Sequence, residues 1–85
     1  MKNEVKILKA LADETRLKIV LFIGNDEICA CEVVPSTKKA QPTVSQHLKI
    51  LLGAGVLSQR KEGKYMLYRI KDRRVLKLIE VLGVK

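Results

Sequence analysis

The side chains best suited to contact nucleic acid gather between residues 41 and 49. They are polar, most of them short or amide-bearing, and they are Gln41, Thr43, Ser45, Gln46, His47 and Lys49. Amides and hydroxyls can hydrogen-bond base edges in a groove, and hydroxyl, imidazole and ammonium groups can contact phosphates. We expect Ser45 and Gln46 to reach base edges and Lys49 to contact a phosphate. We also expect a phosphate contact from His47, with a partly buried packing role as its alternative.

A single helix is the element that must hold these groups. Apolar residues recur beside them at helical spacing, at Val44, Leu48, Leu51 and Leu52. Pro42 suits the first helical position because its φ is fixed and it has no N–H to lose. Glycine at positions 53 and 55 favours a helix end. The pattern predicts a helix from about Pro42 to Ala54, and an ordinary surface helix with a polar outer face is the alternative.

The charge of the chain indicates an acidic partner. Among 85 residues, 17 are Lys or Arg and 9 are Asp or Glu, which gives a formal net charge of +8 and a pI of about 9.8. Such a pI is typical of DNA-binding domains, whereas an acidic membrane surface and a solubility role are the alternatives. The basic excess lies in the second half, where Arg60, Lys61 and Lys64 are expected to contact phosphates. We therefore predict double-stranded DNA as the partner.

The residues before residue 41 predict three more helices. The first two carry apolar stripes, which are Val5, Leu8, Leu11 and Ala12, then Leu17, Val20, Leu21 and Phe22. Asp13 lies between the two helices and is the expected N-cap of the second. A third, short helix is expected over residues 28–34. Pro35 limits it, because the residue before a proline avoids helical backbone angles.

The residues after the polar helix predict a β-hairpin and a last helix. Strands are expected over residues 56–61 and 65–70, joined by a turn at Gly63. Asp72 is the expected cap of the last helix, whose apolar face holds Val75, Leu76, Ile79 and Leu82. The predicted fold class is mainly α with a small β-hairpin, in one domain over residues 1–85. Its order is helix-helix-helix-helix-hairpin-helix, which is a winged helix-turn-helix with the hairpin as the wing.

Several other classes of protein do not fit the sequence. No apolar run approaches the roughly 18 residues needed to cross a bilayer, and the start of the chain lacks the apolar core of a signal peptide. We therefore expect a cytoplasmic protein with no membrane partner. Because the chain has one histidine, no recognisable carboxylate pair and no glycine-rich phosphate loop, we expect it not to be an enzyme.

Two cysteines, Cys29 and Cys31, form the second set of residues with distinctive chemistry. Two thiolates can contribute two ligands to a soft ion. Residues two apart on a regular helix point about 200° apart, so joint ligation is expected to require unwinding of the first turn. Two other interpretations stay open. In one, the pair is a buried small residue beside an exposed thiol, and in the other it is a strained disulfide.

Four segments in order resemble the ArsR-type family of metal- and arsenic-responsive repressors. The segments are Leu8–Ile19, the Cys-x-Cys stretch Ile28–Val33, the polar helix Gln41–Leu48 and the wing Gly55–Arg69. The resemblance covers nearly the whole chain. It implies a homodimer that binds operator DNA and is released when a metalloid, metal or other signal binds.

The resemblance leaves the effector open. Arsenite sensors of this family have a third cysteine three residues after the pair, where this chain has Val34. Zinc sensors place Asp and His on the last helix, which here has Glu80 but no His. The expected effector is therefore arsenite or a soft metal ion at Cys29 and Cys31, or an oxidant, and DNA binding itself is expected to need no cofactor. The alternatives are a DNA-binding regulator without an inducer and a winged-helix module that docks proteins instead of reading DNA.

The first and last helices are the expected dimer interface, because both have apolar stripes with no obvious partner in so small a fold. We expect Leu8, Ile79 and Leu82 to be buried between subunits.

Overall fold

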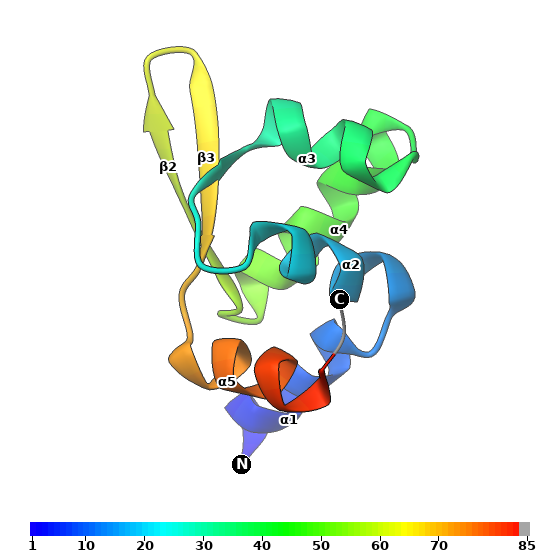
Figure 1. Cartoon of the computed structure of the whole chain (residues 1–85), viewed down its shortest axis with the longest axis vertical. Helices are drawn as coiled ribbons and strands as arrows, with labels where there is room; N and C mark the ends of the chain where they lie inside the picture. The colour runs from blue at the N-terminus through cyan, green and yellow to red at the C-terminus, as the bar shows by residue number, and fades with distance from the viewer. Residues whose placement is uncertain (84–85) are drawn as a thin grey trace.

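The computed structural model describes residues 1–83, which form a helical body and a projecting hairpin (Figure 1). In chain order the elements are α1 (Lys2–Leu11), α2 (Glu14–Ile23), β1 (Ile28–Cys29), α3 (Ala30–Thr37), α4 (Gln41–Gly53), β2 (Leu57–Glu62), β3 (Tyr65–Ile70) and α5 (Arg73–Leu82). This arrangement confirms the predicted winged helix-turn-helix, in which α3 and α4 are the two helices of the helix-turn-helix motif. No helix within residues 1–83 is long and apolar enough to cross a membrane.

The wing is the antiparallel pair of β2 and β3. Their register runs from Leu57 opposite Ile70 to Glu62 opposite Tyr65. Gly63 turns the chain between them with a φ of 60°, a conformation that glycine adopts without steric cost. The hairpin extends away from the helices (Figure 1). The predicted strands and turn are confirmed.

One apolar core lies between the helices and the base of the hairpin. Its fully buried larger side chains are Ile19, Ile23, Leu51, Leu57, Val20, Val33, Val44, Val56 and Val75. The predicted stripe of α4 is confirmed by the burial of Val44, Leu48 and Leu51. The inward placement of Phe22 is wrong, because its side chain is 45% exposed. In α2 the buried residues are Ile19, Val20 and Ile23, which share one face, and Phe22 lies off that face.

The segment from Ile28 to Val34 differs from the predicted helix. Ile28 and Cys29 form β1, which pairs with β3 and makes a three-stranded sheet in the order β1-β3-β2. Helix α3 begins only at Ala30, and Pro35 lies inside it instead of ending it. A proline there removes one backbone hydrogen bond. In the last turn of α3, the hydroxyl of Ser36 donates to the Val33 carbonyl oxygen at 2.6 Å.

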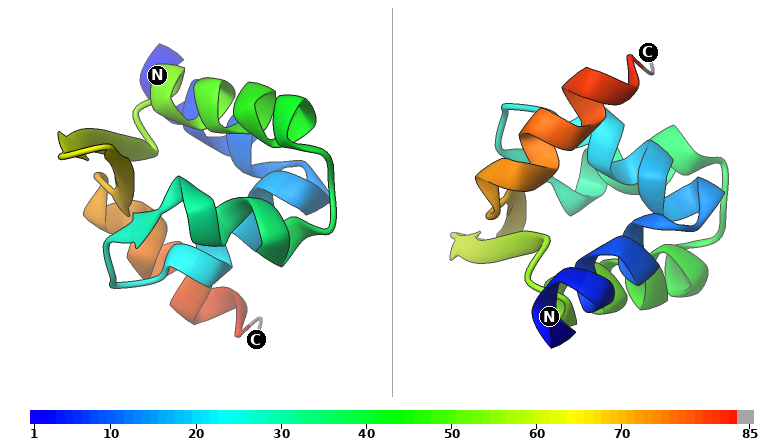
Figure 2. Two further views of the ribbon diagram at one scale, coloured as in Figure 1. Left: turned by 90° about the horizontal axis from the view of Figure 1, so that it is seen from above. Right: turned by 90° about the horizontal axis from the view of Figure 1, so that it is seen from below.

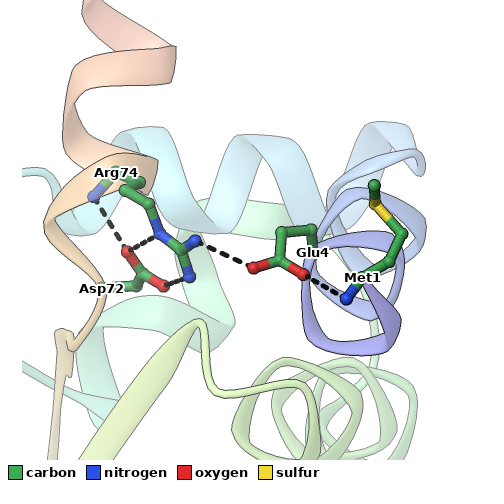
Figure 3. Close-up of polar contacts among 4 residues, drawn as sticks. All are labelled: Met1, Glu4, Asp72 and Arg74. Carbon is green, nitrogen blue, oxygen red and sulfur yellow. Dashed lines mark hydrogen bonds and ion pairs between the residues drawn. The ribbon is translucent and has the colours of Figure 1, made fainter.

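Helices α1 and α5 lie at the same end of the molecule (Figure 2, right) and are joined by charged side chains (Figure 3). Nη1 of Arg74 lies 3.3 Å from Oε2 of Glu4, and Nη2 lies 2.7 Å from Oδ2 of Asp72. Oδ1 of Asp72 also accepts the backbone N–H of Arg74 at 2.9 Å. The predicted capping of α5 by Asp72 is therefore confirmed.

These contacts predict a loss of stability in acid. The side-chain hydrogen bond from Arg74 is the main cause that lowers the pKa of Asp72 below its ordinary value of 3.8. The carboxylate therefore stabilises the fold above that pH, and the contribution is lost as the pH falls through the lowered pKa. We expect Asp72→Asn, which keeps the cap, to flatten the fall in unfolding free energy between neutral pH and about pH 3. Urea unfolding at several pH values in this range measures the unfolding free energy, with Asp26→Asn as the control. The prediction is contradicted if Asp72→Asn and wild type lose unfolding free energy equally as the pH falls.

Candidate nucleic-acid interface

The outer face of α4 presents most of the polar residues expected to contact DNA. Because Val44, Leu48 and Leu51 are buried, the helical period turns the opposite side to solvent. The exposed residues on that side are Thr43, Ser45, Gln46 and Lys49, whereas Gln41 is exposed in the first turn of α4, in line with Val44 and Leu48. Helix α4 thus brings together four of its six predicted contact residues on one polar surface.

His47 occupies the edge of this surface. Its side chain is only 18% exposed, and Nδ1 lies 3.9 Å from Oδ2 of Asp13 and 3.3 Å from Nη1 of Arg16. At 100° per residue, position 47 lies beside the buried row of α4 and not on the outer face. The imidazole therefore faces α2.

Two lysines of the wing are exposed beside the turn of the hairpin. They are Lys61 at the end of β2 and Lys64 in the turn. Nζ of Lys64 lies 5.5 Å from the centroid of the Tyr65 ring, within the range of a cation–π contact. The tip of the wing therefore carries positive charge, as predicted.

Arg60 differs from the other two basic residues of the wing, because carboxylates of the same chain bind it. Its Nε and Nη2 donate to the two carboxylate oxygens of Glu27, both at 2.7 Å, and Nη2 also lies 2.8 Å from Glu62. The side-chain hydrogen bond from Arg60 lowers the pKa of Glu27. No local pattern indicates the contact between Arg60 and Glu27, since the two residues are 33 positions apart.

The backbone fixes the wing relative to α4. The N–H of Val56 donates to the carbonyl oxygen of Leu51 near the end of α4 at 3.0 Å. The carbonyl oxygen of Val56 accepts the N–H of Lys71, which follows β3, at 2.9 Å. Val56 is also fully buried, so it connects the end of α4 to the base of the hairpin inside the core. These contacts set the position of the basic tip relative to the outer face of α4.

Cys29 and Cys31 lie at the junction of β1 and α3. Their sulfur atoms are joined as a disulfide, with Cα atoms 5.1 Å apart. Cys29 is the N-cap of α3 with extended backbone angles, and its Sγ accepts the N–H of Cys31 at 3.1 Å. The prediction that the pair must unwind a helical turn to meet is therefore wrong, because Cys29 precedes the helix. Cys29 is half-buried and Cys31 is exposed.

The cysteine pair adjoins the wing. Cys29 pairs with Leu67 of β3, and a surface hollow of about 370 Å³ beside the pair is also lined by Glu32, Glu62 and Tyr65. Val34, at the position where arsenite sensors of the resembled family have a third cysteine, is half-buried. Within residues 1–83, no group of three or more His, Cys, Asp or Glu side chains is placed to hold a metal ion. Once this disulfide is reduced, the pair in the described part of the chain offers two sulfur ligands.

Comparison with known proteins gives a consistent result. The family model for bacterial regulatory proteins of the arsR family matches residues 13–59, from the cap of α2 into β2. An uncharacterized HTH-type transcriptional regulator of Methanocaldococcus jannaschii is 44% identical over 82 residues, which cover 95% of this chain and 92% of that protein. The arsenical resistance operon repressor of Escherichia coli is 42% identical over 67 residues, which cover 78% of this chain but only 57% of the repressor.

A solved structure shares both the fold and the arrangement of elements. The homodimeric winged helix-turn-helix DNA-binding domain of a possible ArsR-family regulator from Mycobacterium bovis superposes with a TM-score of 0.85. It is 27% identical, and the match covers 96% of this chain and 79% of that domain.

Proposed function

The chain belongs to the ArsR family of bacterial regulatory proteins, and we propose that it is a homodimeric repressor released from its operator by a thiol-reactive effector. Membership makes it a transcriptional regulator with a winged helix-turn-helix DNA-binding domain. Regulators of this family are not enzymes. The operator contacts, the dimer and the effector are the parts that we propose.

The observation that carries the DNA-binding surface is the division of α4 into a buried row and an exposed polar face. Ser45 and Gln46 are assigned to base edges in the major groove, and Lys49 to a phosphate. Gln41 and Thr43, at the start of α4, are assigned to the backbone nearby. The proposed DNA-binding surface also includes Lys61 and Lys64 of the wing, together with Arg60 and His47. Arg60 would exchange a carboxylate partner for a DNA phosphate. His47 would contact DNA through the exposed part of its ring.

The test is a titration with a duplex that the wild-type protein selects from a random-sequence library, here called the selected duplex. We expect log K to fall with log salt by about 0.9 for each phosphate neutralised. Gln46→Ala should lose about 1–3 kcal/mol of discrimination at one position of each half-site, and Lys64→Ala should weaken all duplexes alike. A random duplex is the control. If wild type binds no duplex, the protein-docking alternative is favoured.

The dimer is supported by the exposed apolar residues at the α1–α5 end. They are Val5, Leu8, Val81 and Leu82, which are 42%, 56%, 83% and 54% exposed. A groove of about 240 Å³ lies between the same helices, lined by Ile7, Leu8 and Leu78 among others. Apolar area gathered at one end of a small domain favours association, and the M. bovis domain is homodimeric. Two copies then present two α4 helices to half-sites about one DNA turn apart.

The cysteine pair is the proposed effector site. If the effector is an oxidant, a hydroperoxide takes one electron and one proton from each thiol, the two sulfurs join, and the peroxide is reduced to an alcohol and water. If the effector is arsenite or a soft metal ion, the reduced pair supplies two thiolates and the remaining ligands come from solvent. Either effector acts beside β3, since Cys29 pairs with Leu67. A change at the pair therefore reaches the wing through the β1–β3 hydrogen bonds.

A further inference from the structure

One arginine joins three helices around the DNA-facing element. Nε of Arg16, near the start of α2, donates to the carbonyl oxygen of Ala10 at 2.6 Å, and Nη2 donates to that of Lys9 at 3.5 Å. The guanidinium therefore satisfies carbonyl groups at the end of α1. Its Nη1 lies 3.3 Å from Nδ1 of His47, in the middle of α4. A single side chain thus contacts the end of α1 and the middle of α4 while standing on α2.

Asp13 completes this set of polar groups. Its Oδ2 accepts the backbone N–H of Arg16 at 3.0 Å and lies 3.9 Å from Nδ1 of His47. The hydrogen bond from that N–H is the main cause that holds the pKa of Asp13 below its ordinary value. Arg16 and His47 are both half-buried. The carboxylate, the guanidinium and the imidazole therefore meet where water is partly excluded, and such contacts are stronger there than at an open surface.

The contact determines which nitrogen of His47 carries the proton. A guanidinium has only donors, so Nδ1 must accept from Arg16. The proton of the neutral ring then lies on Nε2. Protonation or methylation of Nδ1 is incompatible with this bond.

We propose that Arg16 and His47 are positioning residues, whose hydrogen bond sets the orientation of α4 against α1 and α2. The buried row of α4 holds the helix to the core, but apolar contacts are non-directional. A hydrogen bond from a planar guanidinium is directional. Its acceptor here is Nδ1 of His47, at the edge of the polar face of α4, so the bond restricts how α4 can rotate. The rotation of α4 about its own axis decides which side chains reach the base edges. This inference rests on the proposed DNA contacts of α4, and it gives His47 a role distinct from phosphate contact.

Two substitutions of His47 separate positioning from phosphate contact. Asn places its amide near the position of Nδ1, whereas Gln reaches the position of Nε2. We expect His47→Gln to bind the selected duplex about tenfold more weakly than wild type and His47→Asn to lose clearly less affinity than His47→Gln. Circular dichroism and thermal melting verify that both variants are folded. The reverse order of affinities, with Gln tolerated and Asn not, overturns the proposal.

A second set of variants tests the partner. Arg16→Lys keeps the charge but loses the planar fork, so we expect a loss of about tenfold. The double variant Arg16→Lys/His47→Gln should be no weaker than either single variant, because both remove one shared contact. Arg73→Lys, at an exposed arginine of α5, is the matched control. Losses that add, or an unchanged Arg16→Lys, overturn the proposal.

The nitrogen chemical shifts of His47 give a test that needs no DNA. In the neutral ring of wild-type His47 we expect the proton on Nε2 and none on Nδ1, and we expect a changed Nδ1 shift in Arg16→Lys. A proton on Nδ1 overturns the positioning role. If the wild-type protein binds no duplex, the proposed DNA contacts fail instead. The nitrogen shifts then still decide whether the Arg16–His47 bond exists.

Discussion

Leu8→Glu is expected to sediment as a folded monomer and to bind the selected duplex at least about a hundredfold more weakly than wild type. Leu8 is 56% exposed in the single chain, so a carboxylate there stays hydrated and costs the monomer little. In the proposed dimer the same carboxylate is buried without a partner, which is costly. The loss of affinity follows because two half-sites no longer bind as one unit.

Leu8 gives a sharper test of the dimer than Ile79. Ile79 is half-buried and packs against the core of its own chain, so a charge at this position also destabilises the monomer. Asn3→Glu is the matched control, since it makes the same change of charge at an exposed position of α1. Leu82→Glu, at the far end of the surface, should repeat the result of Leu8→Glu. A Leu8→Glu protein that remains dimeric by sedimentation contradicts the proposed interface.

The elements that the sequence predicted well are those set by local patterns. Helix α4 follows from the spacing of Val44, Leu48 and Leu51 with Pro42 at its start, and the hairpin follows from two short strand patterns joined by a turn at Gly63. Both patterns lie within 14 residues or fewer. The strand β1 could not be found in this way. Its hydrogen-bond partners are in β3, with Ile28 opposite Tyr68, so a distant pairing overrides the helical pattern of its own segment.

The same distinction applies to the candidate site. The exposed residues of α4 were predictable because burial of one helix face determines the other. The partners of His47 and Arg60 were not, since both contacts join residues more than 30 positions apart. The geometry of the cysteine pair depended on β1 as well, because Cys29 is extended only where its strand pairs with β3. Contacts between different helices and strands are therefore the part of the site that could be identified only from the structure.

The cysteine switch is expected to change operator affinity by about 5–150-fold. We expect the reduced wild-type protein to bind the selected duplex tightly, and hydrogen peroxide or arsenite to weaken it. An effector releases DNA only to the extent that it favours the non-binding conformation. Dithiothreitol should restore binding after peroxide, because it returns both sulfurs to thiols.

Variants of the pair separate a switch from a packing role. Cys29→Ser and Cys31→Ser, singly and together, should keep the affinity of the reduced protein, since neither thiol lies on α4, and should lose the response. Ser58→Ala, at a half-buried residue of β2 outside the pair, is the control that should still respond. If wild type and the double serine variant respond identically to peroxide and to arsenite, the cysteines are packing residues.

Arsenite distinguishes ligand binding from oxidation, because it needs both thiols deprotonated and leaves them unjoined. Its effect should weaken as the pH falls, since protons compete with the ion for sulfur. Val34→Cys places a third thiol at the half-buried position where the family's arsenite sensors have one. It should lower the arsenite concentration needed for release, while the response to peroxide in the same titration serves as the reference. A chain that releases DNA with peroxide alone, before and after this substitution, is an oxidant sensor whose two sulfurs do not form a metalloid site.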